Sequence, residues 1–135
     1  MNIDILTSVL EHEGFREKPY QCSEGVWTIG HGLTYLTESE SEEIVANRLE
    51  DLYDRLEEKH TCLESYKYGT RVRILNVLTE MAFQMGWTGL HKFVKMFEAI
   101  SNHDLGLAAV EMLDSKWAKQ TPGRANGLAR KLRTA

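Results

Sequence analysis

Three side chains of different chemistry lie close together in residues 11–34, a short and glycine-rich stretch. Glu13 supplies a carboxyl group, Cys22 a thiol and Thr28 a hydroxyl, with eight and then five residues between them. A protonated carboxyl can donate to a leaving oxygen, and a thiol can serve as nucleophile or weak base. A hydroxyl can both donate to and accept from a water molecule. This combination indicates a site rather than a piece of core.

The carboxyl group lies where a predicted helix ends. Apolar side chains recur at helical spacing over residues 3–10, Asn2 can cap the helix, and Gly14 ends it. Glu13 therefore lies at the C-terminus, where the negative end of the helix dipole and partial burial favour its protonated form. Such a group is suited to donate a proton.

A predicted hairpin carries the other two groups. The sequence Ser-Glu-Gly at residues 23–25 separates two short runs of strand formers and is typical of a tight turn. Cys22 precedes the turn and Thr28 follows it. The hairpin would bring both side chains back beside the helix end.

The rest of the chain is predicted to be helical. Ser39 and Glu42 form a capping box at the start of a long amphipathic helix, either a connector between two lobes or part of a short coiled coil. Further predicted helices cover residues 70–85, 90–100, 104–117 and 122–132, with Gly86 ending the first and Thr121 capping the last. The helix over residues 70–85 is apolar on most sides, so it is predicted to be central.

These elements predict an α+β fold in one domain. A small N-terminal lobe with the hairpin would cover about residues 1–42, a linking helix residues 42–60, and a helical lobe residues 66–135. The length of 135 residues and the 42% hydrophobic content suit a single domain with one connector.

Composition excludes several functions. The formal net charge of -4 gives no basic surface for nucleic acid. No apolar run approaches the roughly 20 residues of a membrane span, and the N-terminus does not look like a signal peptide. The two cysteines, Cys22 and Cys62, are too far apart for a zinc site, and a disulfide is not expected in a reducing compartment. No cofactor is expected.

The spacing of Glu13, Cys22 and Thr28, followed by Ile-Gly-His-Gly, resembles the phage-type lysozymes, glycoside hydrolase family 24. Their pattern is Glu, then Asp or Cys, then Thr, followed by a T-I-G-x-G stretch. Two later blocks agree with the family, namely MAFQMGWTG at residues 81–89 and the W-x-x-Q-T-P-x-R segment at residues 117–124. The three blocks occur in the family's order and span most of the chain.

The resemblance implies an endolysin that hydrolyses the β-1,4 bond between N-acetylmuramic acid and N-acetylglucosamine, in a cleft between the lobes. It implies that Glu13 is the acid, that Arg124 pairs with it, and that Thr28 holds the attacking water. Cys22 stands where aspartate is commoner. Its thiol is expected to be mostly neutral, and it could be a nucleophile, a weak base toward water or a tolerated placeholder.

The resemblance also implies substrate-binding residues. Phe83 would stack on a sugar, although it could equally be core, and Gln84 would hydrogen-bond to the sugar. Gln120 and Thr121 match a polar stretch near Arg124. His31 departs from the family's usual order and is expected to be a surface or packing residue.

Two alternatives stay open beside hydrolysis. A lytic transglycosylase would cleave the same bond without water, and a non-catalytic relative would only bind the wall. The expected partners are peptidoglycan glycan strands, with no nucleic acid and no stable membrane contact, and the protein is expected to be a monomer. It would accumulate in the host cytoplasm and reach the wall or periplasm once a holin opens the membrane.

Overall fold

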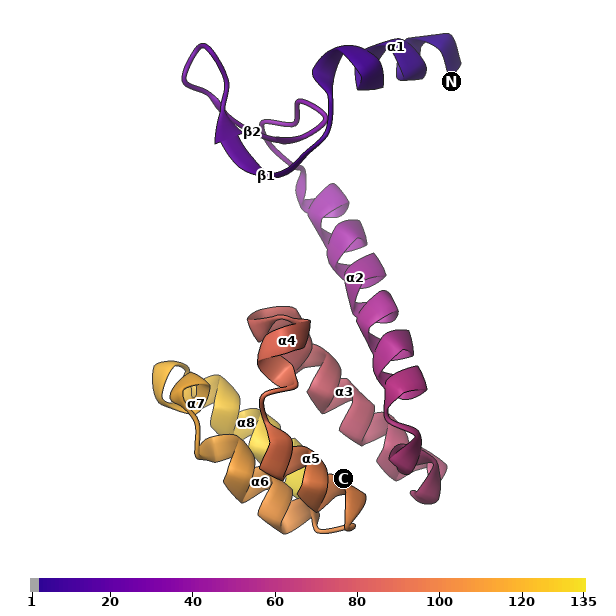
Figure 1. The fold of residues 1–135 in the computed structure, drawn as a ribbon, viewed down its shortest axis with the longest axis vertical. Coiled ribbons are helices and arrows are strands. Elements are labelled where there is room, and N and C mark those ends of the chain that lie inside the picture. Colours follow the sequence, from indigo (N-terminus) through magenta and orange to yellow (C-terminus); the bar gives the residue numbers. More distant parts are fainter. Residues whose placement is uncertain (1–2) are drawn as a thin grey trace. The chain divides into compact units, whose positions relative to one another are not determined.

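The structure, a computed structural model, describes residues 3–135, so the predicted cap at Asn2 lies outside the described residues. The chain divides into two compact units, with the boundary between Ile44 and Val45. Figure 1 identifies the elements of both units. Each unit is described by itself.

The N-terminal unit contains the predicted helix and hairpin. Helix α1 covers Ile3–Glu13, strand β1 Arg16–Gln21 and strand β2 Trp27–Gly30. The two strands are antiparallel, and the register pairs Tyr20 with Thr28. No residue of α1 is buried.

Helix α2, Glu38–Lys59, begins in the N-terminal unit and continues into the C-terminal unit. The capping box at its start is formed by Thr37 and Glu40, so the prediction of Ser39 and Glu42 was wrong by two residues. The Glu40 backbone N–H donates to the Thr37 hydroxyl at 3.2 Å, and that hydroxyl donates to the Glu40 carboxylate at 2.8 Å. The sequence contains two overlapping matches to the motif, and the structure uses the first.

The C-terminal unit is helical. After α2 follow η1 Thr61–Ser65, α3 Tyr68–Met85, α4 Trp87–Leu90, α5 Val94–Ser101, α6 Leu105–Leu113, α7 Lys116–Gln120 and α8 Pro122–Arg133. Helix α6 packs against α5 and α8, and α3 packs against α4 and α8 (Figure 1). The predicted α+β class, mostly helical with an N-terminal hairpin, is confirmed.

One predicted helix begins later than expected, and another is divided. The helix expected over residues 90–100 is α5, which begins only at Val94, and the one expected over 104–117 is divided into α6 and α7. The backbone leaves the helical region at Phe93, with ψ 57°, and at Asp114, with ψ 64°. The Ser115 side chain then accepts from the Ala118 N–H and starts α7.

Thr121 is the N-cap residue of α8, as predicted, but its side chain makes no capping hydrogen bond. Its hydroxyl donates instead to the Trp117 carbonyl at 3.0 Å. Pro122 begins α8, in agreement with the preference of proline for the first helical turn.

The hydrophobic core of the C-terminal unit is built around α3. Seven residues of α3 are buried, among them Leu78 and Met81, which confirms the prediction that this helix is central. Met112 of α6 and Leu132 of α8 are fully buried with them. Cys62 is half-buried against this core, as expected. Among the residues that the structure describes, no helix is long and apolar enough to cross a membrane.

Candidate active site

Glu13 is the last residue of α1, as predicted. Gly14 follows with a positive φ of 66°, and its N–H closes the helix by donating to the Leu10 carbonyl at 3.0 Å. The side chain of Glu13 is exposed, so the expected partial burial is not found in its own unit. The reason is that α1 buries none of its residues there.

A tight turn after β2 contacts the Glu13 carboxyl group. Ile29 and Leu33 exchange two backbone hydrogen bonds of 2.9 Å and thereby close the turn Gly30-His31-Gly32. A Cβ atom placed on Gly32 would lie 2.3 Å from Oε2 of Glu13, so the carboxyl group lies directly against this glycine. The Gly32 position therefore has no room for a side chain while Glu13 keeps its place.

The His31 ring lies against Phe15, with ring centroids 5.3 Å apart and planes inclined by 42°. This half-buried ring is a packing residue, as the sequence predicted. It ties the turn to the residues that follow α1.

Cys22 and Thr28 converge on one backbone carbonyl. The N–H of Cys22 donates to the Val26 oxygen at 2.9 Å, and the Thr28 hydroxyl donates to the same oxygen at 3.1 Å. Because its proton is engaged, the Thr28 oxygen is left to accept a hydrogen bond. Thr28 is buried, so such a bond would come from a water molecule that reaches its side chain in the hairpin.

The thiol is more acidic than the sequence suggested. The backbone N–H groups of Glu24 and Val26 beside the Cys22 sulfur lower the pKa of this thiol below its ordinary value. The hairpin turn causes this, because it directs backbone donors at the side chain that precedes it. The expectation of a mostly neutral thiol stays a prediction, and the lowered pKa favours a larger thiolate fraction than a free cysteine has.

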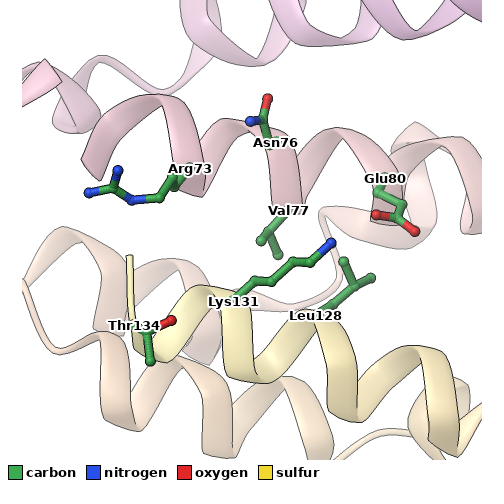
Figure 2. Close-up of a pocket in the computed structure, with 7 residues that line it drawn as sticks. All are labelled: Arg73, Asn76, Val77, Glu80, Leu128, Lys131 and Thr134. Atoms are coloured by element: carbon green, nitrogen blue, oxygen red, sulfur yellow. The ribbon is translucent and has the colours of Figure 1, made fainter. Parts of the chain in front are cut away.

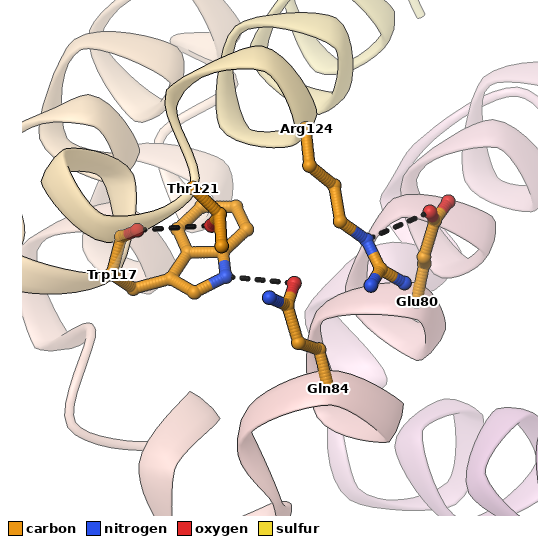
Figure 3. A network of polar contacts seen from close by, with 5 residues as sticks. All are labelled: Glu80, Gln84, Trp117, Thr121 and Arg124. Atoms are coloured by element: carbon orange, nitrogen blue, oxygen red, sulfur yellow. Dashed lines mark hydrogen bonds and ion pairs between the residues drawn. The ribbon is translucent and has the colours of Figure 1, made fainter.

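Three of the predicted substrate-binding residues lie together in the C-terminal unit (Figure 3). The indole N–H of Trp117 donates to Oε1 of Gln84 at 2.9 Å, and the Thr121 hydroxyl donates to the Trp117 carbonyl at 3.0 Å. Arg124 Nε donates to Oε1 of Glu80 at 3.2 Å. The side-chain oxygen of Gln84 thus accepts a hydrogen bond within the protein, and its amide nitrogen can still donate to a ligand.

The other two predicted substrate-binding residues are exposed. Gln120 is exposed at the end of α7. Phe83 is 40% exposed, so it is not a core residue. It lines a hollow of about 510 Å³ together with Arg55 and Trp87, and the Arg55 guanidinium lies 4.2 Å above the Trp87 ring. The stacking of Phe83 on a sugar stays a prediction.

Sequence reasoning missed Gly32 and Glu80. The signal for Gly32 was its place after a strand in Gly-His-Gly, and the signal for Glu80 was its spacing of four from Gln84 on one helix face. Glu80 also lines a hollow of about 310 Å³ between α3 and α8, with Arg73 and Lys131 (Figure 2). The pairing of Arg124 with Glu13 stays a prediction.

The fold and these side chains define a class of protein. A helical α+β chain with a carboxyl group at a helix end, followed by a hairpin with a thiol and a hydroxyl, is a lysozyme-like arrangement. A sequence model of the phage lysozyme family matches residues 10–134. The chain therefore belongs to the phage lysozyme family.

Two curated proteins of Dictyostelium discoideum are similar to this chain. Probable T4-type lysozyme 2 is 28% identical over 107 residues, which cover 73% of this chain and 61% of that protein. Probable T4-type lysozyme 1 is 32% identical over 91 residues, which cover 67% of this chain and 53% of that protein. The matches therefore span between about half and three fifths of the length of these relatives.

Proposed function

We propose that this chain hydrolyses the β-1,4 bond between N-acetylmuramic acid and N-acetylglucosamine in bacterial peptidoglycan and so lyses the host cell. The observation that carries the proposal is the family match over residues 10–134, which includes Glu13, Cys22 and Thr28. The placement of a carboxyl group at a helix end against Gly32 supports it.

In the proposed reaction Glu13 is the general acid. Its proton passes to the glycosidic oxygen as the bond to the anomeric carbon breaks, and the transition state has oxocarbenium character. Arg124 and the polar groups of Gln84, Gln120 and Thr121 would bind the glycan, and Phe83 would stack on a sugar ring.

The second half of the reaction uses water. The Thr28 oxygen accepts a hydrogen bond from this water, and Cys22, whose pKa is lowered by the backbone N–H groups of Glu24 and Val26, takes its proton. The water oxygen then bonds to the anomeric carbon. If the Cys22 sulfur attacks that carbon instead, the reaction has two steps and retains the configuration. The anomer of the first product distinguishes the two routes.

The identity of residue 22 supports a second candidate function. Cys22 departs from the commoner aspartate, and a lytic transglycosylase needs the acid but no activated water. Its products would carry anhydro ends.

The test is mass spectrometry of the products from purified peptidoglycan. Reducing N-acetylmuramic acid ends are expected. Anhydro ends would establish the transglycosylase, and intact glycan would leave a wall-binding protein.

Access to the wall is a further part of the proposal. By analogy with its family, the protein would accumulate in the cytoplasm as a monomer and act after a holin opens the membrane. Cells that express it should lyse only after permeabilisation with chloroform. Prompt lysis without that treatment would contradict this part of the proposal but would not contradict the proposed hydrolysis.

A further inference from the structure

Gly32 differs from the other glycines that have positive φ. These are Gly14, Gly25, Gly30 and Gly86, with φ between 65° and 84°. A Cβ atom on Gly30 would meet only Leu33, at an ordinary 3.5 Å, and the other three would meet nothing within 4 Å. On Gly32, with φ 75°, it would lie 2.3 Å from Oε2, 2.6 Å from Cδ and 3.0 Å from Cγ of Glu13.

This contact involves the whole end of the Glu13 side chain. Its carboxyl group occupies the volume that a methyl group on residue 32 would need, and distances below 3.0 Å essentially never occur for real Cβ atoms. A side chain at this position must therefore displace the carboxyl group or the turn.

The turn itself is held in place from two sides. The Ile29–Leu33 hydrogen bonds close it at its base, and the His31 ring packs on Phe15, two residues after Glu13. Displacement of the carboxyl group is therefore the easier response, because an exposed side chain rotates more readily than a closed turn.

We propose that Gly32 is a positioning residue for Glu13. Its missing side chain lets the carboxyl group lie against the backbone of the turn, and this contact sets the direction in which the acid points. The inference rests on the proposed function, in which Glu13 is the general acid. A misplacement of about 1 Å in a catalytic group can lower the rate by about 10²-fold.

The test compares Gly32→Ala with Gly30→Ala. Both substitutions place alanine at positive φ in the same turn, so both lose a similar amount of stability from backbone strain. Only Gly32→Ala meets Glu13. We expect kcat to fall about 10²-fold in Gly32→Ala with KM nearly unchanged, and to change by less than about threefold in Gly30→Ala.

A double-mutant cycle with Glu13→Ala isolates the contact, because alanine lacks the Cγ, Cδ and Oε2 atoms that a Cβ atom on residue 32 would meet. In the Glu13→Ala background, whose residual rate is low, Gly32→Ala should cost less than about threefold in kcat. If Gly32→Ala lowered kcat by the same factor in both backgrounds, the proposal would be overturned, because backbone strain would then explain the lower rate.

A readout without substrate separates this inference from the proposed function. In ¹³C NMR the Glu13 carboxyl resonance should shift in Gly32→Ala and stay in place in Gly30→Ala. An unchanged resonance together with wild-type kcat would overturn the positioning role. If Glu13→Gln is fully active or the protein cleaves no peptidoglycan, the proposed function fails, and the NMR comparison still decides whether Gly32 positions the carboxyl group.

Discussion

His60 and His91 meet through their Nε2 atoms, which lie 2.9 Å apart. His91 Nδ1 lies 2.7 Å from the Trp87 carbonyl, which can only accept, so this nitrogen carries the proton. Nε2 of neutral His91 is then the acceptor, and His60 is the donor. The Phe97 ring lies parallel to His60, with centroids 4.4 Å apart, and covers one face of the pair.

This pair predicts a loss of stability in acid. Burial, the neighbouring His91 and the charge of Lys59 lower the pKa of His60 from 6.5 to about 4. As the pH falls, the unfolded chain therefore binds a proton at His60 before the folded chain does. The contribution of His60 to the free energy of unfolding is complete above pH 6.5 and is lost as the pH falls to about 4. We expect this loss to be about 1–2 kcal/mol, since solvent screens a half-buried group. Thermal melts from pH 7 to 4 measure it.

His60→Gln should flatten this pH dependence, whereas His12→Gln, on the exposed helix α1, should leave it as it is. Equal slopes in the wild type and in His60→Gln would show that other groups cause the acid sensitivity.

Glu13→Gln tests the acid. The substitution keeps the shape of the side chain and removes the proton, so lysis of peptidoglycan should fall by about 10²–10⁴-fold. The melting temperature should hold or rise, because charges at active sites tend to cost stability. A turbidity assay measures the rate of lysis, and a thermal melt measures the melting temperature. Near-normal lysis by Glu13→Gln would show that Glu13 is not the general acid.

Cys22 can be tested by exchange and by alkylation. If the thiol only serves as a base toward water, Cys22→Asp should be tolerated or more active, because its carboxylate is ionised at neutral pH. Cys22→Ser should lose most activity, since a neutral hydroxyl is a poor base. Iodoacetamide should inactivate the wild type and spare Cys22→Asp.

Cys62→Ser provides the control for alkylation, because Cys62 is half-buried against the core of the C-terminal unit. It should stay active and alkylation-sensitive. Full activity of Cys22→Ser, combined with resistance of the wild type to the reagent, would make Cys22 structural.

Gln84 has a structural role in addition to its proposed contact with a sugar. Gln84→Leu leaves the indole N–H of buried Trp117 without its acceptor, so the free energy of unfolding should fall by about 1–3 kcal/mol. Adding Trp117→Phe removes the orphaned donor as well. The double variant should then lose less stability than the sum of the single variants. Strict additivity in urea melts would mean that the hydrogen bond does not persist in solution.

Arg124 should matter more for activity than for stability. The side chains of Arg124 and Glu80 are 40% and 41% exposed, and such ion pairs contribute less than about 1 kcal/mol. Arg124→Ala should therefore change stability little and lower kcat/KM more than about tenfold through lost glycan binding. Glu80→Gln keeps Arg124 and should retain most activity. If Glu80→Gln lowers kcat/KM as much as Arg124→Ala, the pair acts as a unit.

Local signals in the sequence were enough to predict the secondary structure of the N-terminal unit. Gly14 and the turn at residues 23–25 are clear signals, so the order of α1 and the hairpin, the end of α1 and the position of the turn were predicted correctly. The capping box was misplaced because Thr37 and Ser39 both begin a matching motif, and sequence alone does not rank them.

The C-terminal unit shows where local patterns stop being informative. Apolar side chains continue across Phe93 and Asp114, so periodicity alone started α5 too early and merged α6 with α7. The Glu80–Arg124 pair joins residues 44 positions apart, and no local pattern predicts such a partner. The contact of Glu13 with Gly32 likewise depends on how the turn folds back.

Helix α2 has a practical consequence for dissecting the protein. Its cap, Thr37, belongs to one unit, and most of its length, including buried Leu56, belongs to the other. A fragment cut at the unit boundary would begin in mid-helix with uncapped N–H groups, which costs about 1 kcal/mol and frays the first turn. A truncation that begins before Thr37 would keep the helix intact, so the natural place to divide this chain lies several residues ahead of the point where its two units part.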